Sequence, residues 1–347
     1  MSEATDFHGL DHVPHVEKPY QRADFVSNQE VKWCPGCGDY AILSTFQGIL
    51  PELEIKQENI VIVSGIGCSS RFPYYLDTYG MHTIHGRAPA IASGIAVSRP
   101  DLAVWVVTGD GDALSIGGNH LIHALRRNVN ITIMLFNNRI YGLTKGQYSP
   151  TSELGKVTKS SPKGTVEVPF NAVSLALGAE ASFVARTIDS NRAHLTETLT
   201  RAVQTPGAAL VEIYQNCQIY NTGAFDALKG PEANLIELRH GEPIIFGPDG
   251  SLGVVRGKDG SLGVARVTDV GKKKVVVHDA YREDPSLAFE LSRLTDIGVL
   301  RQATIGVFRD VARPTYDEQV RDQTAGTVSS LDSLQEYITG RDTWTVS

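Results

Sequence analysis

Short, fully apolar runs alternate along the chain with segments whose apolar residues recur at helical spacing. Helical spacing extends from Ala41 to Leu50, ends at Pro51, and returns over residues 90–97 and 119–125. Apolar runs without polar alternation are typical of strands buried on both faces of a sheet. Such strands are predicted at 60–63, 81–84, 103–107, 131–136 and 208–213. The alternation predicts an α/β fold with a doubly wound, mainly parallel sheet.

The two ends of the chain depart from this pattern. Residues 1–30 carry several histidines and charges with little periodicity, which predicts an N-terminal arm that lies on another part of the structure. Residues 31–235 are expected to form the main domain, and residues 236–347 a C-terminal extension. In the extension, DGSLGVVR at 249–256 recurs as DGSLGVAR at 259–266. The Asp-Gly turn signal in each copy predicts a β-hairpin.

Composition and charge narrow the class of protein. The 347 residues are 41% hydrophobic, enough for a sizeable core. A formal net charge of -7, without clustered Lys and Arg, argues against a nucleic-acid partner. No run approaches the roughly 18 apolar residues of a membrane span, and the N-terminus lacks the apolar stretch of a signal peptide. A cytoplasmic protein that does not contact a membrane is therefore expected.

Polar and reactive residues follow each of the predicted strands. Because the carboxyl ends of parallel strands meet at one edge of a sheet, these residues are expected to share one site. They occur in the segments SGIGCSSR at 64–71, HGR at 85–87, GDGD at 109–112, NN at 137–138 and NC at 216–217.

Asp110 and Asn138 are predicted to bind a metal ion together. The 25 residues from 112 to 136 fill one helix and one strand, so a crossover brings the two strand ends side by side. Carboxylate and amide oxygens are hard ligands that suit Mg²⁺, whose coordination shell substrate phosphates commonly complete. Glycines on either side of Asp110 would let a diphosphate approach the backbone, at the N-terminus of the following helix. The predicted ligand is a diphosphate with magnesium.

Five segments together resemble a known family over roughly residues 30–240. A GDG sequence followed about 25 residues later by NN resembles the fingerprint of thiamine-diphosphate enzymes. The longer match resembles the beta subunit of 2-oxoacid:ferredoxin oxidoreductases, and within it the branch that uses 2-oxoglutarate. The segments are CPGCGD at 34–39, GIGCSSR at 65–71, HGRA at 85–88, GDGDALSIGGNHLIHALRRN at 109–128 and NNRIYGLTKGQYSPT at 137–151.

The resemblance implies an activity and a set of site residues. The activity is oxidative decarboxylation of a 2-oxoacid, here 2-oxoglutarate, to an acyl-CoA (succinyl-CoA) and carbon dioxide, with electrons passed through a 4Fe-4S cluster to ferredoxin. Magnesium would be held by Asp110, Asn138 and the backbone carbonyl of Ile140. Thiamine diphosphate would be bound by Ile66, Gly67, Cys68, Ser69, His85, Gly109, Gly111, Asp112, Gly142 and Leu143. The cluster would be held by Cys34, Cys37, Cys68 and Cys217, which are all the cysteines of the chain.

The cysteine spacing bears on the choice between iron and zinc. Cys34-x-x-Cys37 alone suits either metal. Structural zinc usually takes two close pairs, whereas 30 residues separate Cys37 from Cys68 and 148 separate Cys68 from Cys217. We therefore favour an iron-sulfur cluster over zinc, mainly on the resemblance.

Three side chains are candidates for contact with the substrate or cofactor. His85, between a strand and Gly-Arg, is expected to contact the cofactor rather than to be a core histidine. Arg71 and Lys145 are candidate binders of the substrate carboxylates, with a surface position as the alternative for each.

The resemblance also implies partners. An alpha subunit would supply the pyrimidine-binding domain, because no second sheet of that kind is predicted in this chain. Ferredoxin and coenzyme A would be the other partners of the reaction. The alternatives are the beta subunit of a pyruvate:ferredoxin oxidoreductase and a cluster-free thiamine-dependent decarboxylase or synthase, which has no use for four cysteines. A non-enzymatic electron carrier would have no use for Asp110 and Asn138. A nicotinamide enzyme is disfavoured because no G-x-G-x-x-G opens the first strand-helix unit.

Overall fold

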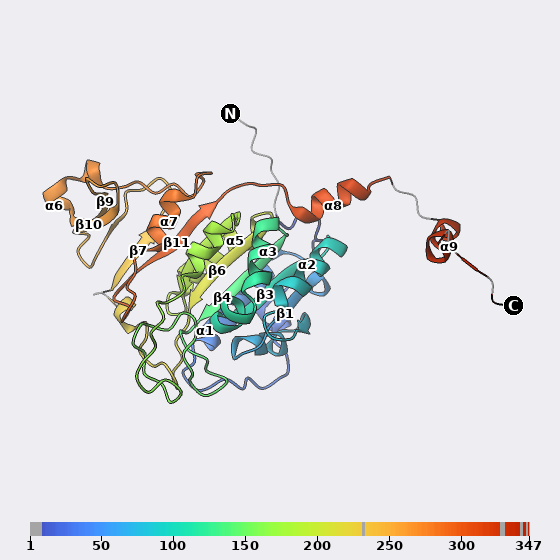
Figure 1. Cartoon of the computed structure of the whole chain (residues 1–347), viewed down its shortest axis with the longest axis horizontal. Helices are drawn as coiled ribbons and strands as arrows, with labels where there is room; N and C mark the ends of the chain where they lie inside the picture. The colour runs from blue at the N-terminus through green and yellow to red at the C-terminus, as the bar shows by residue number, and fades with distance from the viewer. Residues whose placement is uncertain (1–8, 231–232, 327–329, 341–342, 345, 347) are drawn as a thin grey trace.

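The core of the protein is an eight-stranded sheet between two layers of helices (Figure 1). The computed structural model describes residues 9–230, 233–326, 330–340, 343–344 and 346. The strand order is β2-β1-β3-β4-β6-β5-β11-β7, and every pair is parallel except β5 with β11. The prediction of a doubly wound, mainly parallel sheet is confirmed. The strands of this sheet are β1 Ile60–Ser64, β2 Tyr79–His82, β3 Ala103–Gly109, β4 Ile131–Asn137, β5 Phe183–Ile188, β6 Ala208–Tyr214, β7 Asn234–Leu238 and β11 Gln302–Asp310.

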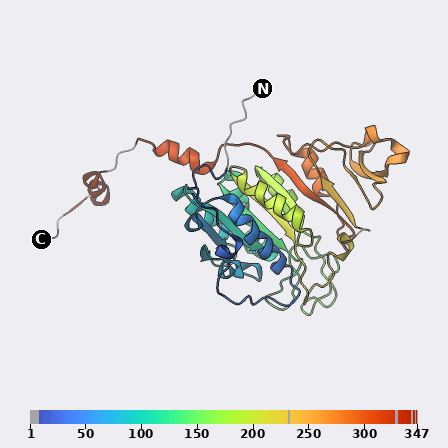
Figure 2. The same cartoon turned by 180° about the vertical axis from the view of Figure 1, so that it is seen from behind.

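Two helix layers bury the two faces of the sheet. On one face α1 (Asp39–Ile49) and α5 (Arg192–Gln204) pack on alternate strand residues such as Ile62 and Trp105 (Figure 2). On the other face α2 (Ala88–Ser98), α3 (Gly118–Arg127) and α4 (Ala172–Gly178) pack on the intervening residues, such as Val63 and Val106. Both faces of the central strands are therefore dry, as their continuous apolar runs predict.

The strands that were not predicted, and the one predicted differently, lie away from the sheet centre. β2 covers 79–82 instead of 81–84, and all four of its residues are exposed because it is an edge strand with β1 alone as a neighbour. β5 and β11 each contain a buried arginine, Arg186 and Arg309, which interrupts the apolar pattern. Arg186 pairs with the buried Glu212 and Arg309 with the half-exposed Glu180, so each buried guanidinium has a counter-charge.

The C-terminal part of the chain contributes both to the main sheet and to a separate small one. β7 and β11 belong to the main sheet, and the boundary expected between residues 235 and 236 falls inside β7. The two copies of the repeat form β9 (Leu252–Arg256) and β10 (Leu262–Arg266), which pair antiparallel as the hairpin prediction requires. With β8 (Ile245–Phe246) they make a three-stranded sheet at one end of the molecule.

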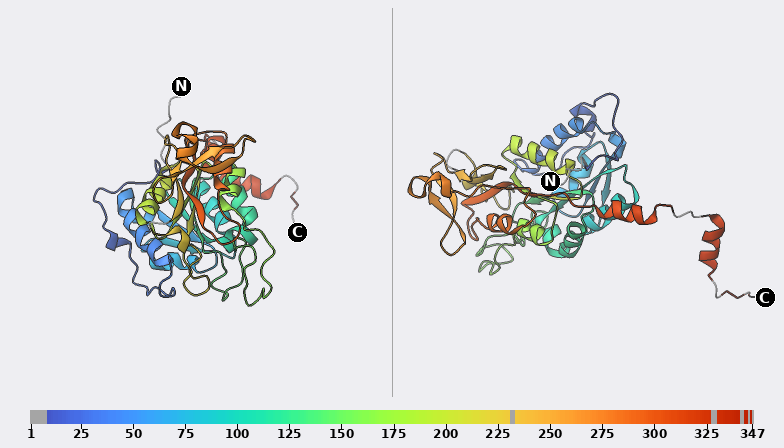
Figure 3. Two further views of the ribbon diagram at one scale, coloured as in Figure 1. Left: turned by 90° about the vertical axis from the view of Figure 1, so that its left-hand side faces the viewer. Right: turned by 90° about the horizontal axis from the view of Figure 1, so that it is seen from above.

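The remaining helices are short or peripheral. α7 (Ser286–Ser292) packs against α4 and β11, α8 (Tyr316–Thr324) packs against α2, and α9 (Leu331–Thr339) extends away from the body (Figure 3). α6 covers Val267–Val270, and the 3-10 helices are η1 Arg22–Phe25, η2 Leu50–Leu53, η3 Gln57–Asn59, η4 Ser69–Tyr75, η6 Asp226–Leu228 and η7 Lys272–Lys274. None of the helices among the described residues combines the length and apolarity needed to cross a membrane.

The N-terminal arm packs on its own chain. Residues 1–8 of the expected arm, with His8, lie outside the described residues. Farther along, the buried side chains of Leu10, Val13 and Phe25 join the core on the α1 and α5 face. The backbone of Val26 bridges to Leu76, which ties the arm to the segment that leads into β2.

Candidate functional site

Loops that follow β1, β2, β3, β4 and β6 line one pocket at the carboxyl edge of the sheet. The pocket therefore lies where ligands bind in open α/β sheets. Every residue expected to bind magnesium or thiamine diphosphate lines it. The lining residues are Ile66, Gly67, Cys68, Ser69, His85, Gly109, Asp110, Gly111, Asp112, Phe136, Asn138, Ile140, Tyr141, Gly142, Leu143, Thr144 and Gln215.

Asp110 presents one side of its carboxylate to this pocket. Parallel pairing of Gly109 with Phe136 sets the end of β3 beside the end of β4, so Asp110 and Asn138 emerge from neighbouring strands. Oδ2 of Asp110 accepts hydrogen bonds from Ser149 Oγ (2.5 Å) and Thr151 Oγ1 (2.6 Å). No described side chain donates to Oδ1, but hydrogen bonds from the backbone N–H groups of Gly111 and Asp110 also stabilise the carboxylate. Burial raises the pKa of Asp110 to about 6, against the lowering effect of the two hydroxyls, and a bound cation would favour the charged form.

The turn after β4 orients the other two expected magnesium ligands. Asn138 Oδ1 accepts a hydrogen bond from Ile140 N (3.1 Å), and its backbone oxygen accepts one from Asn221 Nδ2 (2.9 Å). Between them Arg139 has φ +57°, a left-handed conformation that reverses the chain. Asn138 and Ile140 thereby both face the pocket from one tight turn.

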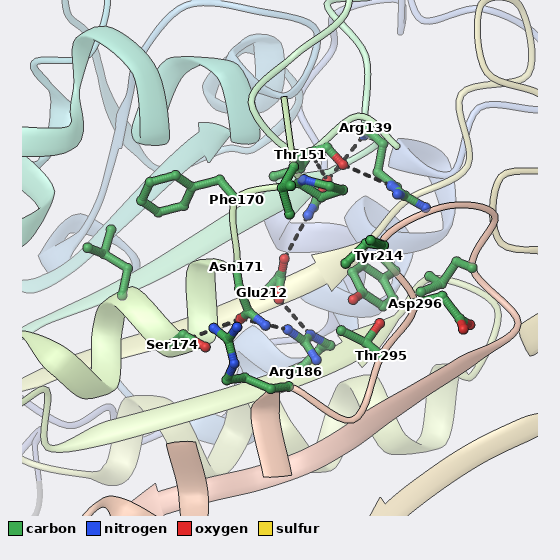
Figure 4. Close-up of a pocket in the computed structure, with 17 residues that line it drawn as sticks. Arg139, Thr151, Phe170, Asn171, Ser174, Arg186, Glu212, Tyr214, Thr295 and Asp296 are labelled. Carbon is green, nitrogen blue, oxygen red and sulfur yellow. Dashed lines mark hydrogen bonds and ion pairs between the residues drawn. The ribbon is translucent and has the colours of Figure 1, made fainter. Parts of the chain in front are cut away.

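A series of hydrogen bonds between buried side chains connects Asp110 to Arg186 of β5. Thr151 Oγ1 lies 2.6 Å from Asp110 Oδ2 and 2.8 Å from Asn137 Oδ1. Asn137 Nδ2 donates to Glu212 Oε1 (2.6 Å), and Glu212 Oε2 accepts from Arg186 Nε (2.6 Å). The Arg186–Glu212 end of the series borders a second cavity of about 420 Å³ (Figure 4). Each of these side chains is at most 5% exposed, and all of them except Asp110 line this cavity.

Two glycines of the pocket differ in what they allow. A Cβ on Gly111 would overlap the ring of Tyr141, whose hydroxyl donates to the carbonyl of Gly111 (3.2 Å). The close approach of Tyr141 therefore requires glycine at position 111. The sequence had suggested another reason for this glycine, namely room for a diphosphate. At Gly109 the nearest atom to a Cβ would be Ser69 Oγ at 3.6 Å, and that buried hydroxyl has no partner among the described residues. A ligand with acceptor oxygens would satisfy it.

Asp112 contributes its main chain to the pocket, because its side chain is fully engaged elsewhere. The carboxylate is 1% exposed. Oδ2 accepts from Thr108 Oγ1 (2.6 Å), and Oδ1 accepts from Gly86 N (2.7 Å) and Ile66 N (3.2 Å) and contacts His85 Nδ1 (2.5 Å). Asp112 thus ties together the loops after β1, β2 and β3.

The four cysteines gather beside this pocket. Cys68 lines it, and a Cβ on Gly142 would lie 3.5 Å from Cys68 Sγ and 3.6 Å from Cys217 Sγ. Burial raises the pKa of Cys68 to about 12, with smaller contributions from neighbours that include Cys217 and Cys34. Burial also raises the pKa of Cys37, next to Asp39, and Cys217 adds to that effect. Thiolates at this site require positive charge nearby, which an iron-sulfur cluster or a metal ion supplies.

The two expected carboxylate binders lie outside the residues that line the pocket. Arg71 Nη1 donates to the carbonyl of Lys32 (3.0 Å), and its charge acts on Cys68. Lys145 is exposed, with φ +74°. Neither side chain therefore points to a substrate site formed by this chain alone.

Among the described residues, no group of three or more His, Cys, Asp or Glu side chains is placed to hold a single metal ion. The expected magnesium ligands include an amide and a backbone carbonyl, so they would not form such a group. In a 4Fe-4S cluster each thiolate binds a different iron, so the sulfurs lie farther apart than around one ion. The Asp110 carboxylate in the pocket lining, the unpartnered Ser69 hydroxyl and the thiols around Gly142 fit the expected cofactors.

Several residues of the site were not predicted. Ser149 and Thr151 anchor Asp110, and Tyr141 and Gln215 line the pocket. Gln215 follows β6 directly and also donates to Cys37 Sγ (3.3 Å). Its position at a strand end was the signal that could have identified it. Nothing in the sequence predicts that Ser149 and Thr151 fold back onto Asp110.

Comparison with known proteins agrees with this geometry. Residues 65–213 match the family of thiamine pyrophosphate enzymes, C-terminal TPP-binding domain. The chain is 61% identical to the 2-oxoglutarate oxidoreductase subunit KorB of Mycobacterium tuberculosis, over 96% of this chain and 91% of the relative. It is 41% identical to the 2-oxoglutarate synthase subunit KorB of Methanocaldococcus jannaschii, over 62% and 79% of the two chains.

A solved structure resembles the whole chain. It is the 2-oxoglutarate:ferredoxin oxidoreductase of Magnetococcus marinus, determined with 2-oxoglutarate, coenzyme A and succinyl-CoA bound. The TM-score is 0.75 and the identity 32%, over 94% of this chain and 99% of the other. With a pocket at the sheet edge within the region that matches a TPP-binding domain, and with relatives of this length and identity, the chain belongs to the family of 2-oxoglutarate and 2-oxoacid:ferredoxin oxidoreductase beta subunits.

Proposed function

We propose that this beta subunit takes part in the oxidative decarboxylation of 2-oxoglutarate to succinyl-CoA and carbon dioxide, with electrons delivered to ferredoxin through a 4Fe-4S cluster. The observation that carries the proposal is the position of Gly142. This residue lines the pocket, and a Cβ on it would lie within 3.6 Å of the sulfurs of Cys68 and Cys217. The choice of 2-oxoglutarate is supported by the relatives that are named for it. A cluster-free decarboxylase would have no use for thiols beside the pocket.

The residues of the pocket have distinct proposed roles. Asp110, Asn138 and the carbonyl of Ile140 would hold Mg²⁺, whose positive charge would offset the negative charge of the diphosphate. Ser69 Oγ and main-chain N–H groups at Gly111, Asp112, Gly142 and Leu143 would bind the diphosphate oxygens. When bound, thiamine diphosphate supplies the carbon nucleophile and electron sink that decarboxylation of a 2-oxoacid requires. Exclusion of water from this chemistry would fall to apolar side chains such as Ile66 and Leu143 once a partner covers them.

The surface around the pocket supports the proposal of an alpha subunit. Ile66 and Leu143 line the pocket, yet they are 42% and 46% exposed. Ile84 and Ile116, which belong to segments next to it, are 74% and 53% exposed. Exposed apolar side chains that cluster at a site mark a surface for a partner. We propose that the alpha subunit covers this surface, brings the pyrimidine-binding domain, and shares the coenzyme A and 2-oxoacid sites, and that the complex works in the cytoplasm.

Co-purification with the alpha subunit tests the substrate. The complex is expected to reduce a viologen with 2-oxoglutarate and coenzyme A at a kcat/KM at least tenfold above that for pyruvate. The purified beta subunit alone is expected to be inactive. A preference for pyruvate would contradict the choice of acid, and turnover by the single chain would contradict the need for the partner.

A pair of variants in that complex separates the two cofactors. Asp110→Asn is expected to lose thiamine diphosphate, measured in a denatured extract, and to keep its iron. Cys217→Ser is expected to lose iron and viologen reduction, and to keep thiamine diphosphate. Loss of both cofactors in both variants would mean that the pocket and the cysteines do not act as separate sites.

A further inference from the structure

We infer that Asp112 is a positioning residue, whose carboxylate holds His85 as the tautomer with hydrogen on Nδ1 and leaves Nε2 as the ring nitrogen that the pocket can use. The inference rests on the proposed function, because it takes the pocket to be the place where cofactor and acid meet. It gives the second aspartate of GDGD a role distinct from that of Asp110.

The geometry at Asp112 is that of an acceptor fixed on all sides. Its Oδ1 accepts hydrogen bonds from the main-chain N–H groups of Gly86 (2.7 Å) and Ile66 (3.2 Å). A main-chain N–H group can act only as a donor. The same oxygen lies 2.5 Å from His85 Nδ1. An oxygen surrounded by donors in this way favours hydrogen on Nδ1, since an unprotonated Nδ1 would face it with two lone pairs in contact.

Two glycines, Gly65 and Gly86, make the contact between Asp112 and His85 possible. A Cβ on Gly65 would overlap the Asp112 carboxylate, so the loop after β1 can close on it with glycine alone. Gly86 has φ +72°, and a Cβ there would lie 2.6 Å from the backbone nitrogen of Gly117. His85 therefore sits at the end of a loop that the packing holds in place.

The other nitrogen of His85 is free. The side chain of His85 is 43% exposed while that of Asp112 is 1% exposed, so the ring spans the border between the buried carboxylate and the pocket. Within the described residues Nε2 has no hydrogen-bond partner. The other charged group near His85 is Arg87, whose Nη1 lies 3.5 Å from the backbone oxygen of His85. A histidine oriented through Nδ1 by a buried acceptor is the usual way for a protein to present Nε2.

Nuclear magnetic resonance of the alpha-beta complex tests the tautomer directly. The complex would be labelled with ¹⁵N-histidine and studied without cofactor at pH 9, and the His85 signals assigned by their loss in His85→Gln. We expect Nδ1 at the shift of a protonated ring nitrogen and Nε2 at that of an unprotonated one. The opposite pattern, or an averaged one, would overturn the inference whatever the activity of the complex.

A double-mutant cycle tests the functional consequence. Asp112→Asn keeps the shape, because the two main-chain donors hold the amide oxygen at the Oδ1 position and the amide N–H group can donate to Thr108. Alone it is expected to lower kcat about tenfold or more, through loss of the charge that supports His85. In a His85→Gln background the same change should leave kcat within about twofold. Equal losses in both backgrounds would show a merely structural role.

Two comparisons keep the interpretations apart. Asp317→Asn, at another buried aspartate that accepts a main-chain hydrogen bond far from the pocket, is expected to leave kcat unchanged. If the parent complex does not turn over 2-oxoglutarate, the proposed function fails while the resonance experiment still decides the tautomer. If the parent is active and the cycle is additive, the proposed function stands and the inference fails.

Discussion

At the scale of single residues, position next to a strand end was the most informative signal. Asp110, Asn138 and His85 could be placed at one site because each follows a strand of the parallel part of the sheet. The groups that hold them were hidden, since Thr151 reaches Asp110 across 41 residues of sequence and through a loop without regular structure. The sequence specified which residues line the pocket better than which residues orient them.

Asp110 should make magnesium binding sensitive to pH. Burial raises its pKa to about 6, so below that pH a proton competes with the metal and the affinity should fall about tenfold for each further pH unit. Thr151→Val removes a hydrogen bond that lowers this pKa, so the decline should begin at a higher pH. Calorimetric titration of the complex with Mg²⁺ and thiamine diphosphate between pH 5 and 8 would measure both effects.

A matched control is available within the same sheet. Thr132→Val changes a buried threonine of β4 at the strand end remote from the pocket, and it should leave the pH dependence of the parent complex. An affinity that is flat from pH 5 to 8 in the parent would contradict the role of Asp110.

At the scale of elements, the strands predicted from continuous apolar runs are the central ones. β5 and β11 were missed because Arg186 and Arg309 stand inside them. Arg186 is fully buried and pairs with Glu212 of the neighbouring strand β6 at 2.6 Å, while Arg309 pairs with Glu180 at 3.0 Å. Pattern reasoning treats each charge as exposed, and a partner from a distant strand cannot be read from local sequence.

The Arg186–Glu212 pair should be costly to break from one side. Glu212→Ala leaves a buried guanidinium without its counter-charge and should lower the free energy of unfolding by about 3–5 kcal/mol. Glu212→Gln retains an acceptor and should cost less. Replacement of both residues, Arg186→Met with Glu212→Leu, should recover most of the loss. Urea unfolding of the complex followed by circular dichroism would rank the variants, and a double variant as unstable as Glu212→Ala would refute the explanation.

At the scale of the whole molecule, the body that carries the pocket is separate from the C-terminal helix α9. Every residue of α9 is exposed, including Leu331 and Tyr337, and the helix stands apart from the sheet (Figure 1). The resemblance to relatives predicted the body, whereas the position of this helix followed from no pattern in the chain.

Removal of residues 327–347 should therefore leave the fold intact. The midpoint of thermal unfolding is expected to change by less than about 2 °C, because every described residue of this segment is exposed. Viologen reduction by the truncated complex should match that of the full-length one. A large fall in the midpoint would show that α9 packs on the alpha subunit or on a second copy of the complex.

The backbone of Gly142 has a consequence for the passage of electrons. It lines the cofactor pocket on one side and approaches the thiols of Cys68 and Cys217 on the other. A donor in the proposed cofactor pocket and an acceptor held by those thiols would therefore be neighbours across this backbone segment. The proposed electron transfer would then need no further carrier between the two sites, so we expect the overall rate to be set by bond breaking or by the release of product.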